Sequence, residues 1–300
     1  QPTVPRRIIY GETRISGVLG FAETSSNNEY LHLVVLLATH EVNQIGTVYI
    51  NEQALTLDGS GNVTAPSQFA NLVRVNKHLG SDGQSADSDL VAESSKWTND
   101  HKLSGIAYVY VRLKFDADAF PNGLPNISAL VQGKKVFDPR TSTTAYSTNP
   151  ALCIRDYLTD SKYGFGASSD EIDDTSFTTA ANICEESVSL NAGGTENKYT
   201  MNGTIESNAT PKQTLENLLT SMGGIVIYSN GTFKIKAAKY VSPSVTLDEG
   251  DARGAIGLQT NRSRRDNYNA VKGVFVSPTN NYIAADYPAF TSSTFETEDG

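Results

Sequence analysis

The chain has 300 residues, a length that suggests about two domains, each able to bury a core of its own. Its 33 acidic and 24 basic residues give a net charge of -9, which argues against a protein that grips nucleic acid, because phosphate binding needs clustered cations. The longest apolar run, 33–38, is far shorter than the roughly 20 residues that cross a bilayer, and the N-terminus lacks the basic and apolar regions of a signal peptide.

The first half of the chain has the patterns of β-strands. In 109–115, alternation predicts one buried face and one wet face. The buried side would carry Val109, Val111, Leu113 and Phe115, and the wet side Tyr110, Arg112 and Lys114. Further strand candidates are 7–10, 17–22, 31–37 and 47–50, and glycines at 59–61 indicate a turn.

Residues 76–105 change to a polar composition with few aliphatic side chains, which predicts a surface excursion rather than a core element. A short helix is predicted at 88–93. Trp97 is the only tryptophan, and we expect it to anchor the excursion on the body, although it could instead face a partner.

A helix is predicted near 149–159. Pro150 has no N–H to lose at a first helical position, and Asn149 can cap the free amides above it. Leu152, Tyr157 and Leu158 fall roughly on one face. Gly164 and Gly166 permit backbone angles that other residues resist, so the chain can turn away sharply after the helix.

Two further helices are predicted near 175–188 and 210–222. The first has an apolar stripe at helical spacing, namely Phe177, Ala181, Cys184 and Val188. The second begins at a capping-box-like start and directs Leu215, Leu218, Leu219 and Met222 inward. The two cysteines, Cys153 and Cys184, have apolar neighbours on predicted helices and are interpreted as small buried hydrophobic residues.

A hairpin is predicted at 225–237, because Asn230 and Gly231 tolerate the positive φ angles of a type I′ turn. Its wet face would carry Lys234 and Lys236. Another strand is predicted at 269–276, followed by a turn that begins near Pro278.

These patterns predict an α+β fold that is mostly β, with β-barrel or sheet domains and about three packed helices. One β-rich domain is placed at 1–140 and includes the polar excursion near 76–105, and an α+β domain is placed at 141–300. Because the chain begins with Gln1 and has no obvious closing element, we expect a fragment of a longer protein.

The stretch 146–166 resembles one family, the tail-tip hub proteins of siphophages, whose type member is the tip attachment protein J of lambda-like tailed phages. In that family a Tyr-Ser-x-Asn-Pro-Ala start, a short helix that carries aromatic residues and a Tyr-Gly-x-Gly exit follow at this spacing. The matching residues here are Tyr146, Ser147, Asn149, Pro150, Ala151, Asp156, Tyr163, Gly164 and Gly166.

The resemblance continues through the rest of the second half and covers roughly half of the chain. Later matching residues are Asn230, Gly231, Asp266, Asn269, Val271, Pro278 and Asn280, and 4–11 is similar to N-terminal segments of J-like proteins. We treat all these residues as structural rather than catalytic.

The resemblance implies a hub in the virion tail tip of a phage or prophage, made in the bacterial cytoplasm. It implies a homotrimer that caps the tail tube, contacts the distal tail protein ring and the tape measure protein, and reaches the host receptor through C-terminal domains that are absent here. DNA would pass without specific binding. No enzymatic activity, cofactor or membrane insertion is implied.

The sequence shows no recognisable catalytic motif. The chain contains no GxxxxGK[ST] loop, GxSxG elbow, HExxH pair or CxxC pair, and its four histidines lack metal-ligand spacing. The cluster Arg262, Arg264 and Arg265 is interpreted as a solvated turn or an intersubunit salt bridge, with an anion or partner contact as the alternative.

Two other functions stay open. A tail-associated glycosidase would use two carboxylates that face each other across a cleft, drawn from Asp170, Glu171, Asp173 and Asp174, although acids before a helix are more simply explained as capping. A carbohydrate-binding module would present Trp97, Tyr282 and Tyr287 along one exposed groove.

Overall fold

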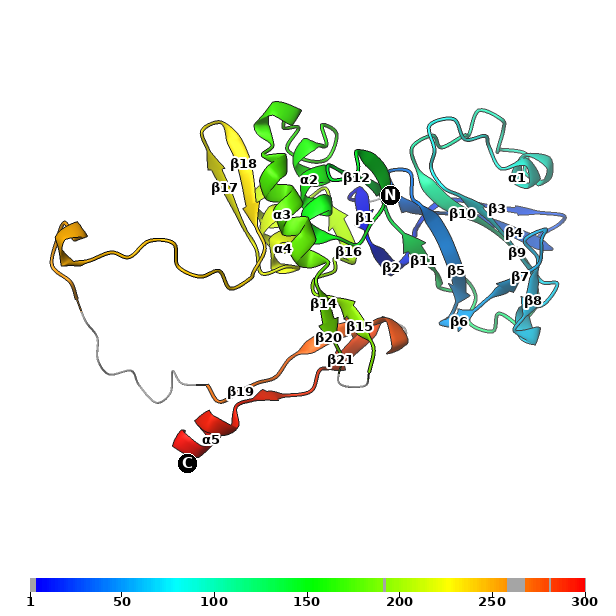
Figure 1. Ribbon diagram of the computed structural model, residues 1–300. Helices are drawn as coiled ribbons and strands as arrows, with labels where there is room; N and C mark the ends of the chain where they lie inside the picture. The colour runs from blue at the N-terminus through cyan, green and yellow to red at the C-terminus, as the bar shows by residue number, and fades with distance from the viewer. Residues whose placement is uncertain (1–3, 191–192, 258–267, 281, 300) are drawn as a thin grey trace. The chain divides into compact units, whose positions relative to one another are not determined.

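The computed structural model describes residues 4–190, 193–257, 268–280 and 282–299 (Figure 1). The chain divides into two compact units, Gln1–Lys239 and Tyr240–Gly300, which are taken one at a time below. The predicted division near residue 140 lies inside the first unit and stays a prediction. Among the described residues, no helix is long and apolar enough to cross a membrane.

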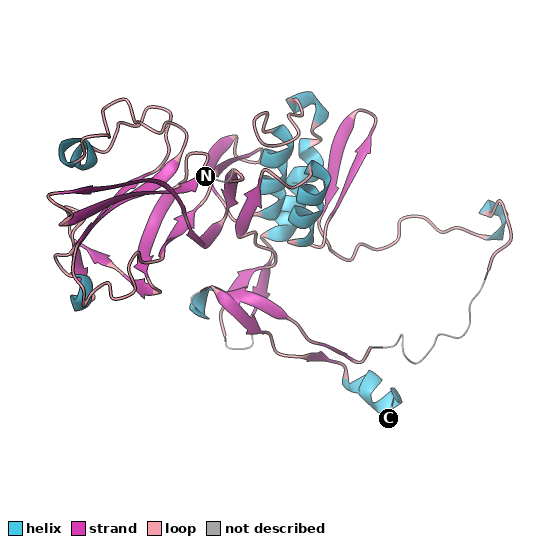
Figure 2. Cartoon of the chain, turned by 180° about the vertical axis from the view of Figure 1, so that it is seen from behind, coloured by secondary structure: helices cyan, strands magenta, loops and turns pink. Residues whose placement is uncertain are grey.

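Two open four-stranded antiparallel sheets form the first half of unit one (Figure 2). The first has the order β3-β4-β10-β9, with bounds Val18–Ser25, Tyr30–Ala38, Ala107–Lys114 and Val73–His78. The second has the order β2-β11-β5-β6, with bounds Glu12–Ser16, Ile127–Gln132, Gln44–Ile50 and Gln53–Ala54. A small ladder of β7 (Thr56–Leu57) and β8 (Val63–Ala65) spans the predicted turn at 59–61, and the 3-10 turn η1 (Ser67–Phe69) follows it.

A cluster of buried aliphatic side chains lies between the two sheets. It takes Val35 and Val109 from the first sheet and Val48 and Ala129 from the second, and each of these four is at most 5% exposed. β-branched residues that alternate along each strand supply this layer, as expected for sheets that pack face to face.

The prediction that Tyr110 lies on a solvent-exposed face of β10 is wrong. Tyr108 and Tyr110 are both 0% exposed, because the excursion 76–105 covers that side of the sheet. Its helix α1 (Ser88–Glu93) contributes Leu90, and Trp97 packs 5.0 Å from Phe21 between ring centroids. The excursion therefore supplies core side chains, and Trp97 anchors it on the body.

The prediction that Phe115, at the end of β10, is buried is also wrong, since this residue is 76% exposed. It follows Lys114, the last residue of the strand.

The second half of unit one is a helical layer with small ladders (Figure 1). Its helices are α2 (Pro150–Thr159), α3 (Asp174–Cys184) and α4 (Pro211–Thr220), with the 3-10 turn η2 (Ser169–Glu171) before α3. Its ladders pair β1 (Arg7–Tyr10) with β16 (Gly203–Glu206), β12 (Lys135–Asp138) with β13 (Thr143–Tyr146), β14 (Ser187–Ser189) with β15 (Thr195–Asn197), and β17 (Ile225–Ser229) with β18 (Thr232–Lys236).

The helices share a second cluster of buried side chains with β1 and β18. Phe177, Ala181 and Cys184 face this cluster from α3, and Met222, which follows α4, is 0% exposed. α3 ends at Cys184, four residues before the predicted end, because Ser187–Ser189 pairs as β14; Val188 is 36% exposed and lies outside the apolar stripe.

Unit two has few buried side chains in its described residues. It contains β19 (Ala270–Val271) paired with β22 (Phe290–Thr291), β20 (Val274–Ser277) paired with β21 (Ile283–Asp286), the turns η3 (Glu249–Asp251) and η5 (Pro278–Asn280), and α5 (Ser293–Asp299). The single strand predicted at 269–276 is therefore broken at 272–273, between β19 and β20.

The prediction of a mostly β α+β fold is confirmed, with α2, α3 and α4 as the packed helices. The sheets are open in the described residues, so of the two predicted alternatives the sheet forms and the closed barrel does not.

Candidate functional site

Helix α2 lies within the stretch 146–166, and residues of this stretch define its start and its exit. Asn149 caps it, because the side-chain oxygen accepts a hydrogen bond from the N–H of Ala151 at 3.1 Å. The side-chain nitrogen of Asn149 donates to the carbonyl of Ala181 at 3.0 Å and to Glu185 at 2.8 Å. This one side chain therefore starts α2 and ties it to the end of α3.

An ion-pair network extends from that contact. Arg140 binds Asp138 at 2.7 Å and Glu185 at 2.6 Å. Hydrogen bonds from Arg140, assisted by its charge, lower the pKa of Glu185. The loop between β12 and β13 is thus linked through Glu185 to Asn149.

The chain leaves helix α2 through a close backbone contact at Gly164. A Cβ at Gly164 would lie 1.8 Å from the carbonyl oxygen of Tyr157, so only glycine fits that position. Gly166 has a φ of 69°. Just before Gly164, Tyr163 donates from its hydroxyl to the carbonyl of Thr39 at 3.2 Å, so the exit of α2 is attached to the strand layer.

A second junction joins the two halves of unit one through Lys134. Its ammonium lies 2.7 Å from Asp156 and 2.6 Å from Asp160, both on or next to α2. Tyr10, on β1, donates its hydroxyl proton to Asp156 at 2.5 Å. Burial opposes the charge on Lys134, yet the two carboxylates raise its pKa above the ordinary value. Burial and then Asp156 raise the pKa of Tyr10.

His40 holds the same junction from the other side of β1. Its Nε2 accepts the N–H of Ile9 at 2.9 Å, and its Nδ1 lies 2.7 Å from the carbonyl of Glu41. The ring is therefore neutral, with its proton on Nδ1. Burial lowers the pKa of His40 to about 4.

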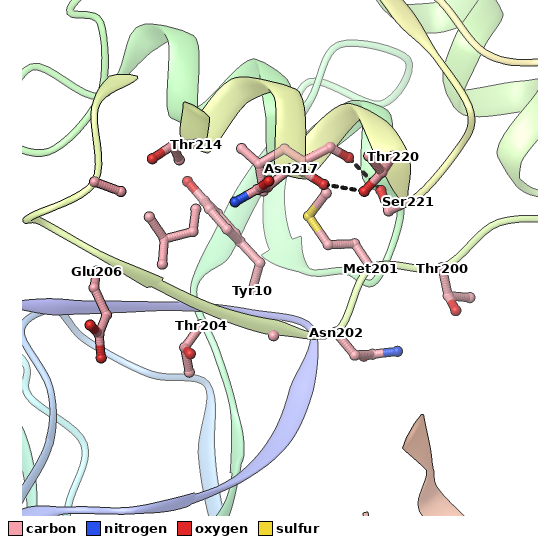
Figure 3. Close-up of a pocket in the computed structure, with 14 residues that line it drawn as sticks. Tyr10, Thr200, Met201, Asn202, Thr204, Glu206, Thr214, Asn217, Thr220 and Ser221 are labelled. Carbon is pink, nitrogen blue, oxygen red and sulfur yellow. Dashed lines mark hydrogen bonds between the residues drawn. The ribbon is translucent and has the colours of Figure 1, made fainter. Parts of the chain in front are cut away.

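A pocket of about 350 Å³ lies beside this junction, between β16 and α4 (Figure 3). Tyr10 forms one wall and Asn217, Thr220 and Ser221 form another. The hydroxyls of Thr220 and Ser221 donate to backbone carbonyls of α4 at 2.6 Å each. Glu206 is the one charged side chain among the described residues that line it, and it faces Arg7 at 3.4 Å. No histidine, cysteine or lysine is among the described residues that line it.

The described residues offer little reactive chemistry elsewhere. Cys153 and Cys184 are free and buried. Burial raises the pKa of Cys184 to about 11 and that of Cys153 well above its usual range, so both thiols keep their protons. In the described part of the chain, no group of three or more His, Cys, Asp or Glu side chains is placed to hold a metal ion.

Of the four acids of the glycosidase alternative, Glu171 and Asp174 have structural contacts. Glu171 accepts from Ser168 in a capping box, and Asp174 forms a two-point ion pair with Arg155 at 2.6 and 3.0 Å. Asp173 is the N-cap residue of α3. The capping explanation therefore holds for Glu171, whereas the Asp173 side chain makes no cap hydrogen bond and Asp174 pairs with a cation of α2.

The carbohydrate-binding alternative loses its main side chain. Trp97 is 6% exposed and stacks on His101 with a centroid distance of 4.8 Å, so its face is not available as a platform for a sugar ring.

The other predicted site residues lie in ladders and turns of their own units. Tyr146 ends β13, and burial raises its pKa to about 12. Asn230 and Gly231 form the β17–β18 turn with φ of 53° and 77°. In unit two, Asn269 accepts from the N–H of Ser292, and Pro278 begins η5. Asp266 and the cluster Arg262, Arg264 and Arg265 lie outside the described residues.

Sequence reasoning did not find Lys134 and Tyr10 as partners of α2. The spacing of Asp156 and Asp160 was a usable signal, because residues four apart share a helix face. Nothing local pointed to a cation 22 residues upstream or to a tyrosine 146 residues upstream.

The comparisons with known proteins agree with the predicted resemblance. Baseplate hub protein pb3 of Escherichia phage T5 is 26% identical over 202 residues, which cover 61% of this chain and 21% of that protein. Tip attachment protein J of Escherichia phage SECphi27 is 24% identical over 199 residues, which cover 61% of this chain and 16% of that protein. The resemblance to phage tail-tip hub proteins is confirmed.

This chain spans about a fifth or less of the length of these relatives. A chain in a solved structure described as the virion of a native gene transfer agent particle matches 98% of this chain and 66% of its own length, with a TM-score of 0.54 and 16% identity. That likeness shows a shared fold. No family model matches the hub-like chain. Together the relatives indicate a phage tail, baseplate hub or tip protein, and their names are those of virion components.

Proposed function

We propose that the chain is a non-enzymatic module of the central hub in the tail tip of a phage or prophage. The observation that carries this proposal is the match of 61% of the chain to a baseplate hub protein and to a tip attachment protein. The fold likeness over 98% of the chain to a component of a virion-like particle supports it.

In this role the hub caps the tail tube and links the distal tail ring to the host-recognition region during attachment and DNA ejection. Its neighbours are the distal tail protein ring and the tape measure protein, and the receptor is met by domains beyond this chain. Such a part must transmit force without deforming. The contacts of Lys134 and Tyr163 support this role, because they fasten the strand layer to α2 and its exit, and His40 ties β1 to the segment after β4.

Two hub domains are proposed, at 1–140 and 141–300. Two separate buried clusters support two domains, although β1 and β12, from the N-terminal part, contribute Ile8, Tyr10 and Val136 to the helical cluster. The polar contacts of Tyr10 and Lys134 cross the boundary near residue 140, so the halves would move together.

The acidic balance of the chain suits a hub through whose central channel DNA passes without specific binding. Its net charge of -9 disfavours tight contact with phosphates. Variants that neutralise acids should leave the rate of DNA ejection unchanged on the face away from the lumen and slow it on the lumen face.

The hub is proposed to work as a homotrimer. The solution mass of the 32.3 kDa chain, measured by light scattering over a concentration series, tests this together with negative-stain images. A species of three chains with a central hole supports the proposal. A monomer at all concentrations, also in the presence of the distal tail protein, counts against it.

A further inference from the structure

The middle of the excursion 76–105, which carries α1, lies on the face of the β3-β4-β10-β9 sheet that is turned away from the second sheet (Figure 1). We refer to residues 85–102 as the strap. Gln84 closes its base, because the side-chain oxygen accepts the N–H of Gly80 at 2.9 Å and the side-chain nitrogen donates to the carbonyl of Ile106 at 3.1 Å. The two ends of the strap are therefore held together on the body.

The strap covers a small buried cluster of its own. The cluster has five buried members, two from the strap and three from the sheet, namely Leu90, Trp97, Val34, Tyr108 and Tyr110. It is separate from the larger cluster between the two sheets, which takes the alternate side chains of the same strands. Loss of the small cluster would thus leave the larger one in place, so the strap can leave the sheet without unfolding it.

Ionic contacts hold the strap on the sheet. The carboxylate of Glu93, on α1, lies 2.9 Å from Arg74 on β9 and 2.8 Å from Arg112 on β10. Asp87, at the N-cap of α1, lies 2.7 Å from His78 on β9. The side chain of Glu93 is 28% exposed, so water reaches its ion pairs and salt screens them. Solvent can therefore compete for the Glu93 contacts.

The interface between the strap and the sheet also contains unsatisfied polar groups. Among the described residues, four buried side-chain atoms form no hydrogen bond, namely Nε of Arg74, Nε of Arg112, the hydroxyl oxygen of Tyr108 and Nε1 of Trp97. All four belong to this interface, because the two arginines bind Glu93 and the two aromatic residues are members of the small cluster. Buried polar groups without a partner destabilise the closed state, and opening lets water satisfy them.

We propose that the strap is a cover that opens as one unit while both sheets stay folded, and that its opening exposes the sheet face that carries Tyr108 and Tyr110. The separate cluster, the solvated ion pairs of Glu93 and the unsatisfied groups all favour an opening at this interface over one between the two sheets. The opening does not depend on the proposed hub role. It gives the chain an aromatic surface that the closed form hides.

The test measures how fast a thiol under the strap is labelled in the full chain. Val34 on β4 and Val109 on β10 are both 0% exposed, but Val34 lies under the strap and Val109 lies between the two sheets. Val34→Cys and Val109→Cys are treated with iodoacetamide under native conditions, and mass spectrometry of peptides identifies the labelled thiol. The buried native thiols of Cys153 and Cys184 provide a control within each molecule.

We expect the thiol of Val34→Cys to be labelled at least about tenfold faster than that of Val109→Cys or the native thiols, because only the first is reached by an opening of the strap. Glu93→Gln, added to Val34→Cys, should raise this rate about fivefold, because it removes the charge that holds the strap. Glu29→Gln is the matched control, since Glu29 pairs with Lys114 of the same sheet at 3.3 Å outside the strap.

Equal labelling rates for the two valine variants would overturn the proposal, because the strap would then open only when the whole unit unfolds. The same conclusion follows if Glu93→Gln speeds the labelling of Val109→Cys as much as that of Val34→Cys.

Hydrogen exchange of the wild-type chain gives an answer that needs no variant to fold. The N–H of Leu90 bonds to Asp87 and that of Trp97 to Ser94, so the two groups have different partners within the strap. A single opening gives both amides the same protection factor, lower than that of the amides of β11, and added salt should lower it further. Unequal protection of Leu90 and Trp97, or protection equal to that of β11, would contradict the cover.

Discussion

The ammonium of Lys134 lies 2.7 Å from the carboxylate of Asp156, and this contact joins the end of the two-sheet layer to helix α2. The same ammonium holds Asp160, and Tyr10 holds Asp156 from β1. Three chain segments thus meet in one polar junction, which explains how two separately buried clusters can act as one body.

Replacement of this cation should destabilise unit one strongly. Lys134→Met would leave two carboxylates, each with less than a fifth of its side chain exposed, without their partner. We expect a loss of about 2–3 kcal/mol in the free energy of unfolding, below the range for fully buried pairs because these groups are partly solvated. Urea denaturation measures it.

Lys212→Met is the control for that experiment, since Lys212 is 86% exposed and lies 3.8 Å from Glu216. Its effect should stay within about 0.5 kcal/mol. If both variants lost the same stability, the polar junction would not be a structural link.

The cap of α2 should matter more than the cap of α4. Asn149→Ala removes one accepted hydrogen bond and two donated ones, whereas Thr210→Ala removes one bond to the N–H of Gln213 at an exposed position. Losses of about 2 and about 1 kcal/mol are expected. Thermal denaturation compares them, and an equal loss would mean that the link from Asn149 to α3 contributes nothing.

Gly164 should not tolerate alanine. The added Cβ would overlap the carbonyl oxygen of Tyr157, so the backbone after α2 must shift, at a cost of about 1–3 kcal/mol or more. Gly203→Ala is the control, because its Cβ would meet open space. Denaturation midpoints should fall for the first variant only; an unchanged midpoint for Gly164→Ala would show that the exit turn can relax.

Acid should loosen the junction through His40. Its pKa is lowered from 6.5 to about 4, so between these values the unfolded chain binds more protons than the folded one. The stability that the neutral ring supplies is complete above about pH 6.5 and is lost as the pH falls toward 4, by about 3 kcal/mol at most.

His40→Gln provides the comparison, since glutamine can accept the N–H of Ile9 but does not titrate. Unfolding free energies at pH 7 and pH 4.5 should differ less in this variant than in the wild type. The same pH dependence in both proteins would assign the acid sensitivity to other groups.

Local signals in the sequence located several features of the site. The pair Asn149 and Pro150 coincides with the start of α2, and Asn230 with Gly231 forms the turn between β17 and β18. These features depend on helix capping and on backbone angles. Both act over a few residues, so they can be predicted from a short stretch of sequence.

Features that depend on contacts between distant segments could not be predicted from the local sequence pattern. Tyr110 has the spacing of a wet-face residue, but the excursion carrying Leu90 and Trp97 folds over it. Likewise, Val188 continues an apolar helical stripe, yet pairing with Glu196 makes it part of β14. In both cases a tertiary contact decides the outcome against the local pattern.

The most direct test of the hub assignment is immunogold electron microscopy of particles from the phage or prophage that encodes this chain, with antibodies raised against the chain. We predict gold at the distal end of the tail. Label spread along the tail or on the capsid, or particles that lack the protein altogether, would contradict the account.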